Sequence, residues 1–200
     1  MLAAAVAALL LAAPPTTRDV LPVVVPPPAG SGTSSGVDYQ YTWGPGAGPI
    51  PHLAVFDRRR RATDALPRPA RAFARFSQGD VAHARRLLNA GGASIYAWPA
   101  KSGSELCVAR EPRGGATCVR SFAHGAYPQV EPRLNVWGVV DDDAVQVDVT
   151  VGRGVLHATL GQNAFFLALP HGAVLPSRIV VSERDGARHI YVIKRLRPAR

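Results

Sequence analysis

From Ala93 onward, the sequence is a succession of short runs of β-branched and aromatic residues, separated by residues that form turns. Side chains of these types fit the pleated, half-buried surface of a sheet. The runs are SIYAW, ELCVAR, ATCVR, LNVWGVV, AVQVDVTV, VLHATL, AFFLAL, RIVVSER and RHIYVIK. So many short strands in about 100 residues predict a mainly β fold, either an antiparallel β-sandwich or a barrel-like domain.

The run AVQVDVTV at 144–151 shows the clearest alternation. A strand places successive side chains on opposite faces, so this pattern predicts one buried and one polar face. One face would carry Val145, Val147, Val149 and Val151, and the other Gln146, Asp148 and Thr150. The turns GRG at 152–154 and RDGA at 184–187 supply residues that tolerate positive φ, which tight hairpins require.

The two cysteines of the chain lie in the stretch CVAREPRGGATCV at 107–119. If EPRG forms a four-residue loop, Cys107 faces Cys118 across a hairpin, where Cβ atoms are about 4.5 to 5.5 Å apart. A disulfide is therefore expected, and closing this short loop would stabilise the fold by about 3 kcal/mol. Leu106, Val108 and Val119 would point to the core, with the cysteines on the less apolar side.

Two other roles for these cysteines are a metal site and a catalytic thiol. A metal site fits poorly, because two ligands this far apart have no local His or Cys pair to complete a tetrahedron. The stretch TCVRS resembles the nucleophile region of L,D-transpeptidases, where Ser-His-Gly precedes a Cys that is followed by an aliphatic residue and Arg. Here residues 115–117 are Gly-Ala-Thr, and the His-Gly dipeptides at His124 and His171 lie downstream of Cys118. An enzyme with a Cys118 nucleophile remains an alternative, and no metal or cofactor is expected.

One or two short helices are expected before the β-rich part. In SQGDVAHARRLLNAGG at 77–92, Ser77 can cap the first turn together with Asp80, and Gly91 can end the helix. The apolar face of this helix would carry Val81, Ala84 and Leu88. Prolines at 67 and 69 limit any earlier helix to the residues that follow Pro69.

The N-terminal quarter differs from the rest of the chain. Residues 2–13 are an unbroken apolar run, too short for a helix that spans a bilayer but typical of a signal peptide. Residues 14–51 hold nine of the eighteen prolines. We expect a signal peptide or membrane anchor at 1–13, a Pro/Gly/Ser-rich linker at 14–52, a basic segment with a short helix at 53–92, and the β-rich domain at 93–197.

The formal net charge of +9 lies in two flanks of a nearly neutral middle. Residues 51–90 carry +6 and residues 171–200 carry +5, whereas 1–50 and 91–170 carry −1 each. The run Arg58, Arg59, Arg60 and Arg61 could contact an anionic membrane or polymer, together with the C-terminal KRLRPAR. Alternatively, these arginines form a solvent-exposed surface that binds no partner. Nucleic acid is not expected as a partner.

Acidic residues gather in Asp141, Asp142 and Asp143, with Asp148 following in the next strand. Calcium takes six to eight oxygen ligands, but these residues do not have the spacing of a calcium loop. Three acids at the entry of a strand are typical of a capped turn, which is the interpretation we favour. His157 alternates with apolar neighbours in VLHATL and is expected to be an ordinary strand residue.

Several of these stretches together resemble a family of uncharacterised bacterial envelope proteins. The matching stretches are LAVFDRRRRATDALP, ARRLL, the cysteine pair and GVVDDDAVQVDVTVGRGVLHATLGQNAFF, with Asn163 before Phe165 and Phe166. The likeness covers roughly residues 53–193, and this chain has Asp141–Asp143 where members usually show Pro-Asp-Gly. It implies a secreted or membrane-tethered location and supplies no activity.

Three hypotheses follow. The first is an exported, non-enzymatic β-domain that serves the cell envelope as a binding or structural module, with an envelope component as its partner. The second is an envelope enzyme with Cys118 as nucleophile, and the third is polyanion binding through the basic flanks.

Overall fold

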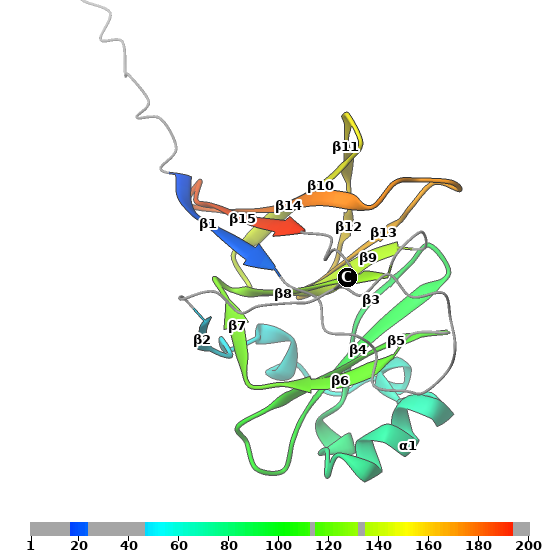
Figure 1. Ribbon diagram of the computed structural model, residues 1–200. Coiled ribbons are helices and arrows are strands. Elements are labelled where there is room, and N and C mark those ends of the chain that lie inside the picture. The colour runs from blue at the N-terminus through cyan, green and yellow to red at the C-terminus, as the bar shows by residue number, and fades with distance from the viewer. Residues whose placement is uncertain (1–16, 24–46, 113–114, 132–134, 194–200) are drawn as a thin grey trace, which may run out of the picture.

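A computed structural model describes residues 17–23, 47–112, 115–131 and 135–193, and within them the protein is mainly β (Figure 1). The helical elements are η1 (Ala54–Phe56), η2 (Ala62–Asp64), α1 (Arg68–Phe76) and η3 (Val81–His83). The strands are β1 (Thr17–Val23), β2 (Ala47–Pro49), β3 (Arg85–Ala90), β4 (Ala93–Pro99), β5 (Leu106–Glu111), β6 (Ala116–Val119), β7 (Ser121–Ala123), β8 (Ala126–Glu131), β9 (Asn135–Val140), β10 (Ala144–Val151), β11 (Gly154–His157), β12 (Thr159–Leu160), β13 (Ala164–Ala168), β14 (Pro176–Glu183) and β15 (Arg188–Ile193).

The strands form three sheets stacked in layers (Figure 1). The upper sheet has the order β1-β15-β14-β10-β11, the middle sheet β12-β13-β9-β8-β7-β2, and the lower sheet β3-β4-β5-β6. Neighbouring strands are antiparallel except β1 and β15, which are parallel. Helix α1 packs beneath the lower sheet, so the sandwich-like architecture expected from the sequence is confirmed.

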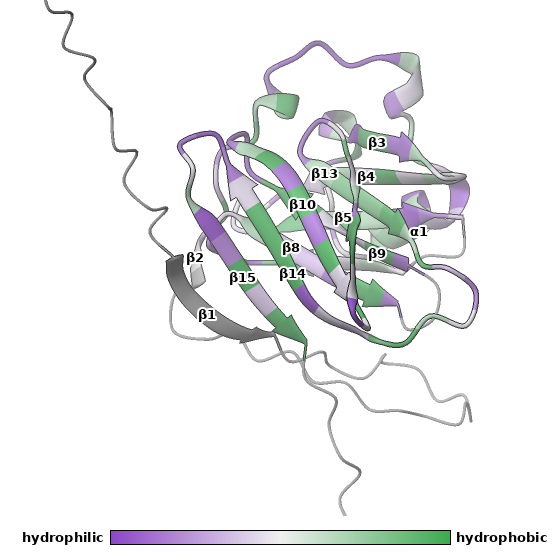
Figure 2. Ribbon diagram, turned by 90° about the horizontal axis from the view of Figure 1, so that it is seen from above, coloured by the Kyte–Doolittle hydropathy of each residue, from purple (hydrophilic) through white to green (hydrophobic). Residues whose placement is uncertain are grey.

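Apolar cores lie between the upper and middle sheets, between the middle and lower sheets, and between the lower sheet and α1. Strand β9 lies in the middle sheet, and all six of its residues are buried because it faces a core on each side. Val136 and Val140 pack toward the upper sheet, whereas Trp137 and Val139 pack toward the lower sheet. The middle sheet is therefore the hydrophobic centre of the molecule. The strands of the upper sheet alternate polar and apolar residues along their length (Figure 2).

All nine runs singled out in the sequence form strands, and β10 keeps most of its expected alternation. Val147 and Val149 are completely buried, but Val145 is about half exposed. The pairing of β10 with β14 shifts register around Val145, so this residue forms a bulge and leaves the buried face.

The helix expected at 77–92 is wrong. Residues 85–90 form β3, which pairs with β4 through a two-residue turn at Gly91 and Gly92, both with positive φ. Two such residues satisfy a tight hairpin, so Gly91 has the expected conformation in a turn and not at a helix end. Ser77 instead follows α1, and the Asp80 carboxylate accepts a hydrogen bond from the Ala82 amide at the start of η3.

The stretch expected to be a linker contributes two strands. β1 pairs with β15 in the upper sheet, and β2 pairs with β7 at the edge of the middle sheet. Residues 1–13, expected to be a signal peptide or membrane anchor, lie outside the described residues. Within the described ranges, none of the helices has the length and apolar character needed to cross a bilayer.

Candidate functional sites

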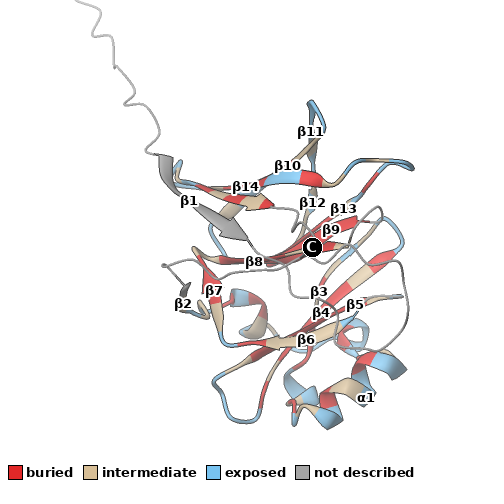
Figure 3. Cartoon of the chain, in the orientation of Figure 1, coloured by how far each residue is buried: buried red, intermediate tan, exposed pale blue. Residues whose placement is uncertain are grey.

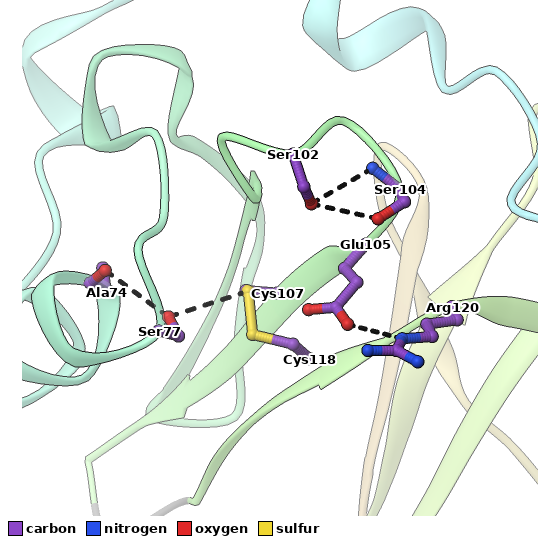
Figure 4. Close-up of a disulfide and its surroundings, with 8 residues drawn as sticks. All are labelled: Ala74, Ser77, Ser102, Ser104, Glu105, Cys107, Cys118 and Arg120. Carbon is purple, nitrogen blue, oxygen red and sulfur yellow. Dashed lines mark hydrogen bonds and ion pairs between the residues drawn. A yellow bond between two sulfur atoms is a disulfide. The ribbon is translucent and has the colours of Figure 1, made fainter.

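Cys107 and Cys118 form a disulfide across the β5–β6 hairpin, with their Cα atoms 3.9 Å apart (Figure 4). They occupy the register expected from the EPRG loop, since Cys107 pairs with Cys118 and Val108 with Thr117. Beyond the intervening Leu106–Val119 pair, Glu105 and Arg120 form an ion pair of 2.6 Å. The hairpin is thus closed by a covalent bond at one cross-strand pair and by an ion pair two positions further along the strands.

The side of the hairpin that carries the cysteines is not the open face expected from the sequence. Leu106 and Val108 do face the core below the middle sheet, but Cys107 is completely buried on the opposite face. That face packs against Ala74 of α1, and the Cys107 sulfur lies 3.8 Å from the Ser77 hydroxyl. Helix α1 therefore covers the disulfide. The alternation in β5 shows which residues share a face, but not that a helix packs on that face.

The residues named for a thiol nucleophile lie in different places. The Cys118 sulfur is bonded to Cys107 and borders the core under α1. His124 occupies the turn between β7 and β8 and stacks on His189 of the upper sheet. His171 lies in an exposed turn between β13 and β14. A nucleophile needs an adjacent base, and neither histidine has a described contact with Cys118.

The four arginines at 58–61 differ in exposure and in their partners. Arg58 points inward and binds the completely buried carboxylate of Asp64 through two hydrogen bonds of 2.7 Å. The same carboxylate accepts hydrogen bonds from the backbone amides of Arg61 at 2.7 Å and Arg86 at 2.9 Å. Burial alone would raise the pKa of Asp64, but the hydrogen bonds from Arg58 and the two amides outweigh it and hold the pKa well below its usual value.

Arg85 completes this polar network and links it to β3. Its guanidinium is buried and donates to the carbonyl oxygens of Ala84 and Arg58, both at 3.0 Å. The segment around η1 and η2 is therefore fixed to the edge of the lower sheet by charge-assisted hydrogen bonds. Only Arg59, Arg60 and Arg61 of the predicted basic run remain exposed.

The acidic turn at 141–143 is a capped turn, as favoured from the sequence. One oxygen of Asp141 accepts hydrogen bonds from the backbone amides of Asp143 and Ala144, both at 3.2 Å. Asp142 instead accepts from the Ala54 amide and from Asn163 Nδ2, at 3.0 and 2.7 Å. The carboxylates of Asp141 and Asp142 thus bind different partners. The described residues contain no group of three His, Cys, Asp or Glu side chains placed to hold a metal ion.

Asn163 connects stretches that are far apart in the sequence. It has a φ of 63° and is buried. Its side chain accepts a hydrogen bond from the Val55 amide at 3.3 Å and donates to the Val140 carbonyl oxygen at 3.2 Å. The stretches LAVF, GVVDDD and QNAFF thus meet in one place, with Asn163 and Asp142 holding η1 against the middle sheet.

A cluster of titratable side chains between the upper and middle sheets was not expected from the sequence. The rings of His124 and His189 stack with centroids 5.3 Å apart and planes 11° from parallel. His189 Nε2 lies 2.7 Å from a Glu183 carboxylate oxygen, and the Tyr191 hydroxyl donates to the Ala123 carbonyl oxygen at 2.6 Å. His124 Nε2 is buried and has no hydrogen-bond partner among the described residues.

Asp141 completes this cluster beside the β7–β8 turn. Burial first, and the nearby Glu183 carboxylate second, raise the pKa of Asp141. Burial, followed by the charges of Asp141 and Glu183, also raises the pKa of Tyr191. Gly125 has a φ of 74°, and a Cβ atom there would collide with the Asp141 carboxylate. The only sequence signal was the His-Gly dipeptide at 124, which proves to be a hairpin turn.

The fold and the crosslink define the protein as a disulfide-bonded, β-sandwich-like domain with three stacked sheets. The disulfide suits an oxidising compartment. No family model, curated protein or solved structure matches this chain.

Proposed function

We propose that the protein is an exported, non-enzymatic β-domain that serves the cell envelope as a binding or structural module. The observation that carries the proposal is the disulfide between Cys107 and Cys118. Disulfides persist in exported proteins and are rare in the reducing cytosol. The apolar run at 2–13, typical of a signal peptide, supports the same location, and so does the resemblance to envelope proteins.

The alternative of an envelope enzyme would need Cys118 as a thiolate. Both described cysteines are engaged with each other, and Cys107 is buried beneath α1. The bond leaves Cys118 without an ionisable thiol, which favours the structural role over the catalytic one.

Thiol titration of the full chain, purified from an oxidising compartment, tests this choice. We expect no reactive thiol in the folded protein, none after denaturation, and two after denaturation with a reductant. The Cys118→Ser variant is the matched control, because it should expose a single thiol at Cys107 only on unfolding. One reactive thiol in the folded parent would overturn the structural role and restore Cys118 as a nucleophile.

Export is tested separately with the full chain fused to an alkaline phosphatase that is active only outside the cytosol. We expect phosphatase activity from the fusion and its loss when residues 1–13 are deleted. Equal activity with and without this segment would contradict its role as the export signal. An inactive parent fusion would contradict export itself.

A second candidate function is polyanion binding through the basic segment. It is favoured by the exposure of Arg59, Arg60 and Arg61, none of which forms an ion pair within the described residues. Retention on a heparin matrix should fall steeply with salt and weaken in the Arg59→Gln/Arg60→Gln variant. Unchanged retention would remove these arginines as the binding surface. Arg58→Gln is not a suitable test, because it would break the pair with Asp64.

A further inference from the structure

The outer face of α1 combines positive charge with an exposed aromatic ring. Arg68, Ala72, Arg75 and Phe76 are all exposed, and Phe76 has 87% of its surface accessible. Residues three, four and seven positions apart share one face of a helix, so these four side chains form a single stripe. Ala70 and Ala74 occupy the opposite, buried face against the lower sheet (Figure 3).

The segment that carries this stripe has a net positive charge. Between Asp57 and Asp80 the sequence contains a single acidic residue, Asp64, which is completely buried and paired with Arg58. In the described part of the chain, Arg68 and Arg75 form no ion pair with an acidic side chain. Their charges are therefore available to an external anion, and no exposed carboxylate of this segment opposes it.

The exposed ring distinguishes between anionic partners. A soluble polyanion needs only the arginines, whereas a large apolar side chain at 87% exposure gains most by leaving water. The interface of an anionic bilayer offers both phosphate groups for arginine and an apolar region for an aromatic ring. Ala72 lies between the charges and is small, so the helix backbone can approach a flat surface closely.

We propose that this stripe of α1 docks the domain onto the surface of an anionic lipid bilayer. Arg68 and Arg75 contact lipid phosphates, and Phe76 enters the interface between headgroups and acyl chains. The upper sheet, at the other end of the stacked layers, then faces away from the membrane (Figure 1). The proposal rests on the exported envelope module proposed above and names its partner surface.

Vesicle co-sedimentation of the full chain tests the proposal, with phosphatidylcholine vesicles compared with phosphatidylcholine–phosphatidylglycerol vesicles. We expect binding to the anionic vesicles alone. An arginine near an anionic surface contributes roughly a fivefold gain in partitioning, so Arg68→Gln/Arg75→Gln should weaken binding about 25-fold. Phe76→Ser should weaken it roughly tenfold, because the buried apolar surface is lost.

Two matched controls lie on the upper sheet. Arg153→Gln/Arg178→Gln removes the same charge from exposed positions, and Val155→Ser removes an apolar side chain that is 51% exposed. Both controls should bind vesicles as the parent does. Losses equal to those of the α1 variants would overturn the proposal, since net charge alone would then explain binding.

Two further outcomes would also overturn it. One is the absence of binding to anionic vesicles. The other is unchanged vesicle binding by Phe76→Ser with loss of heparin retention by the arginine variant, which would assign the stripe to soluble polyanions. Thiol titration and the export fusion are independent of lipid, so their results stand whether or not the vesicles bind.

Discussion

Replacing Asp64 by Ala tests whether the basic segment is held by a buried ion pair. Asp64 is completely buried and accepts four hydrogen bonds, two from Arg58 and one each from the amides of Arg61 and Arg86. Removing it leaves the Arg58 guanidinium, whose side chain is 16% exposed, without its counter-charge. Breaking a buried pair on one side typically costs about 3 to 5 kcal/mol.

Urea unfolding followed by tryptophan fluorescence measures this cost, because Trp98 and Trp137 are buried in separate cores. We expect Asp64→Ala to lower the free energy of unfolding by about 3 to 5 kcal/mol without changing the m-value. Asp57→Ala is the matched control, since Asp57 and its partner His52 are both largely exposed. The control should cost less than about 0.5 kcal/mol.

The pH dependence gives a second measure of the same pair. The pKa of Asp64 is lowered in the folded state, so its stabilisation is present above the unfolded pKa, near 3.8. It is lost as the pH falls through the folded pKa. The parent should therefore lose more stability on acidification than Asp64→Ala does. A cost below about 1 kcal/mol, or parallel acid profiles of parent and variant, would refute the assignment.

Three further predictions concern the crosslink, the middle sheet and the titratable cluster. The Cys107→Ala/Cys118→Ala variant should lose about 3 kcal/mol in urea unfolding, and an unchanged midpoint would contradict the role of the disulfide. Gly138→Ala should cost about 1 to 3 kcal/mol by the same assay, because its Cβ would lie 2.5 Å from a carbonyl oxygen of the neighbouring strand; no loss would disprove this close approach. The pKa of Asp141 is raised when folded, so its contribution favours folding below pH 3.8 and is lost as the pH rises through the folded pKa. Relative to the parent, Asp141→Asn should therefore have a higher free energy of unfolding at neutral pH than it has below pH 3.8. A difference between variant and parent that does not change with pH would exclude the effect.

Local patterns predicted most of the strands after Ala93, although not β7 or β8, and predicted the helices poorly. Strands and tight turns leave short-range signals, such as the alternation in 144–151 and the glycines of the hairpin turns. Residues 81–88 matched a helical spacing as well, but Gly91 and Gly92 turn the chain back and allow 85–90 to pair with β4. Pairing with a neighbouring strand overrode the weaker local preference.

Apart from the disulfide, the candidate sites depended on contacts that the sequence does not encode locally. The disulfide was predicted because both cysteines belong to one hairpin, whose loop fixes their register. The His124–His189 stack joins residues of the middle and upper sheets, which no motif connects. The pairing of Arg58 with Asp64 was equally hidden, although only a few residues separate them, because four consecutive arginines look alike in sequence.

The sequence by itself determined the β-rich class, the position of the nine strand-forming runs and the crosslinked hairpin, since each follows from periodicity, turn residues and loop length. Only the tertiary structure decided that a third sheet exists, that α1 buries the Cys107 face and that one arginine of the basic run is internal. The physical reason is that alternation indicates which residues share a face, whereas burial depends on what packs against that face. In β5 both faces are covered, by the middle sheet on one side and by α1 on the other.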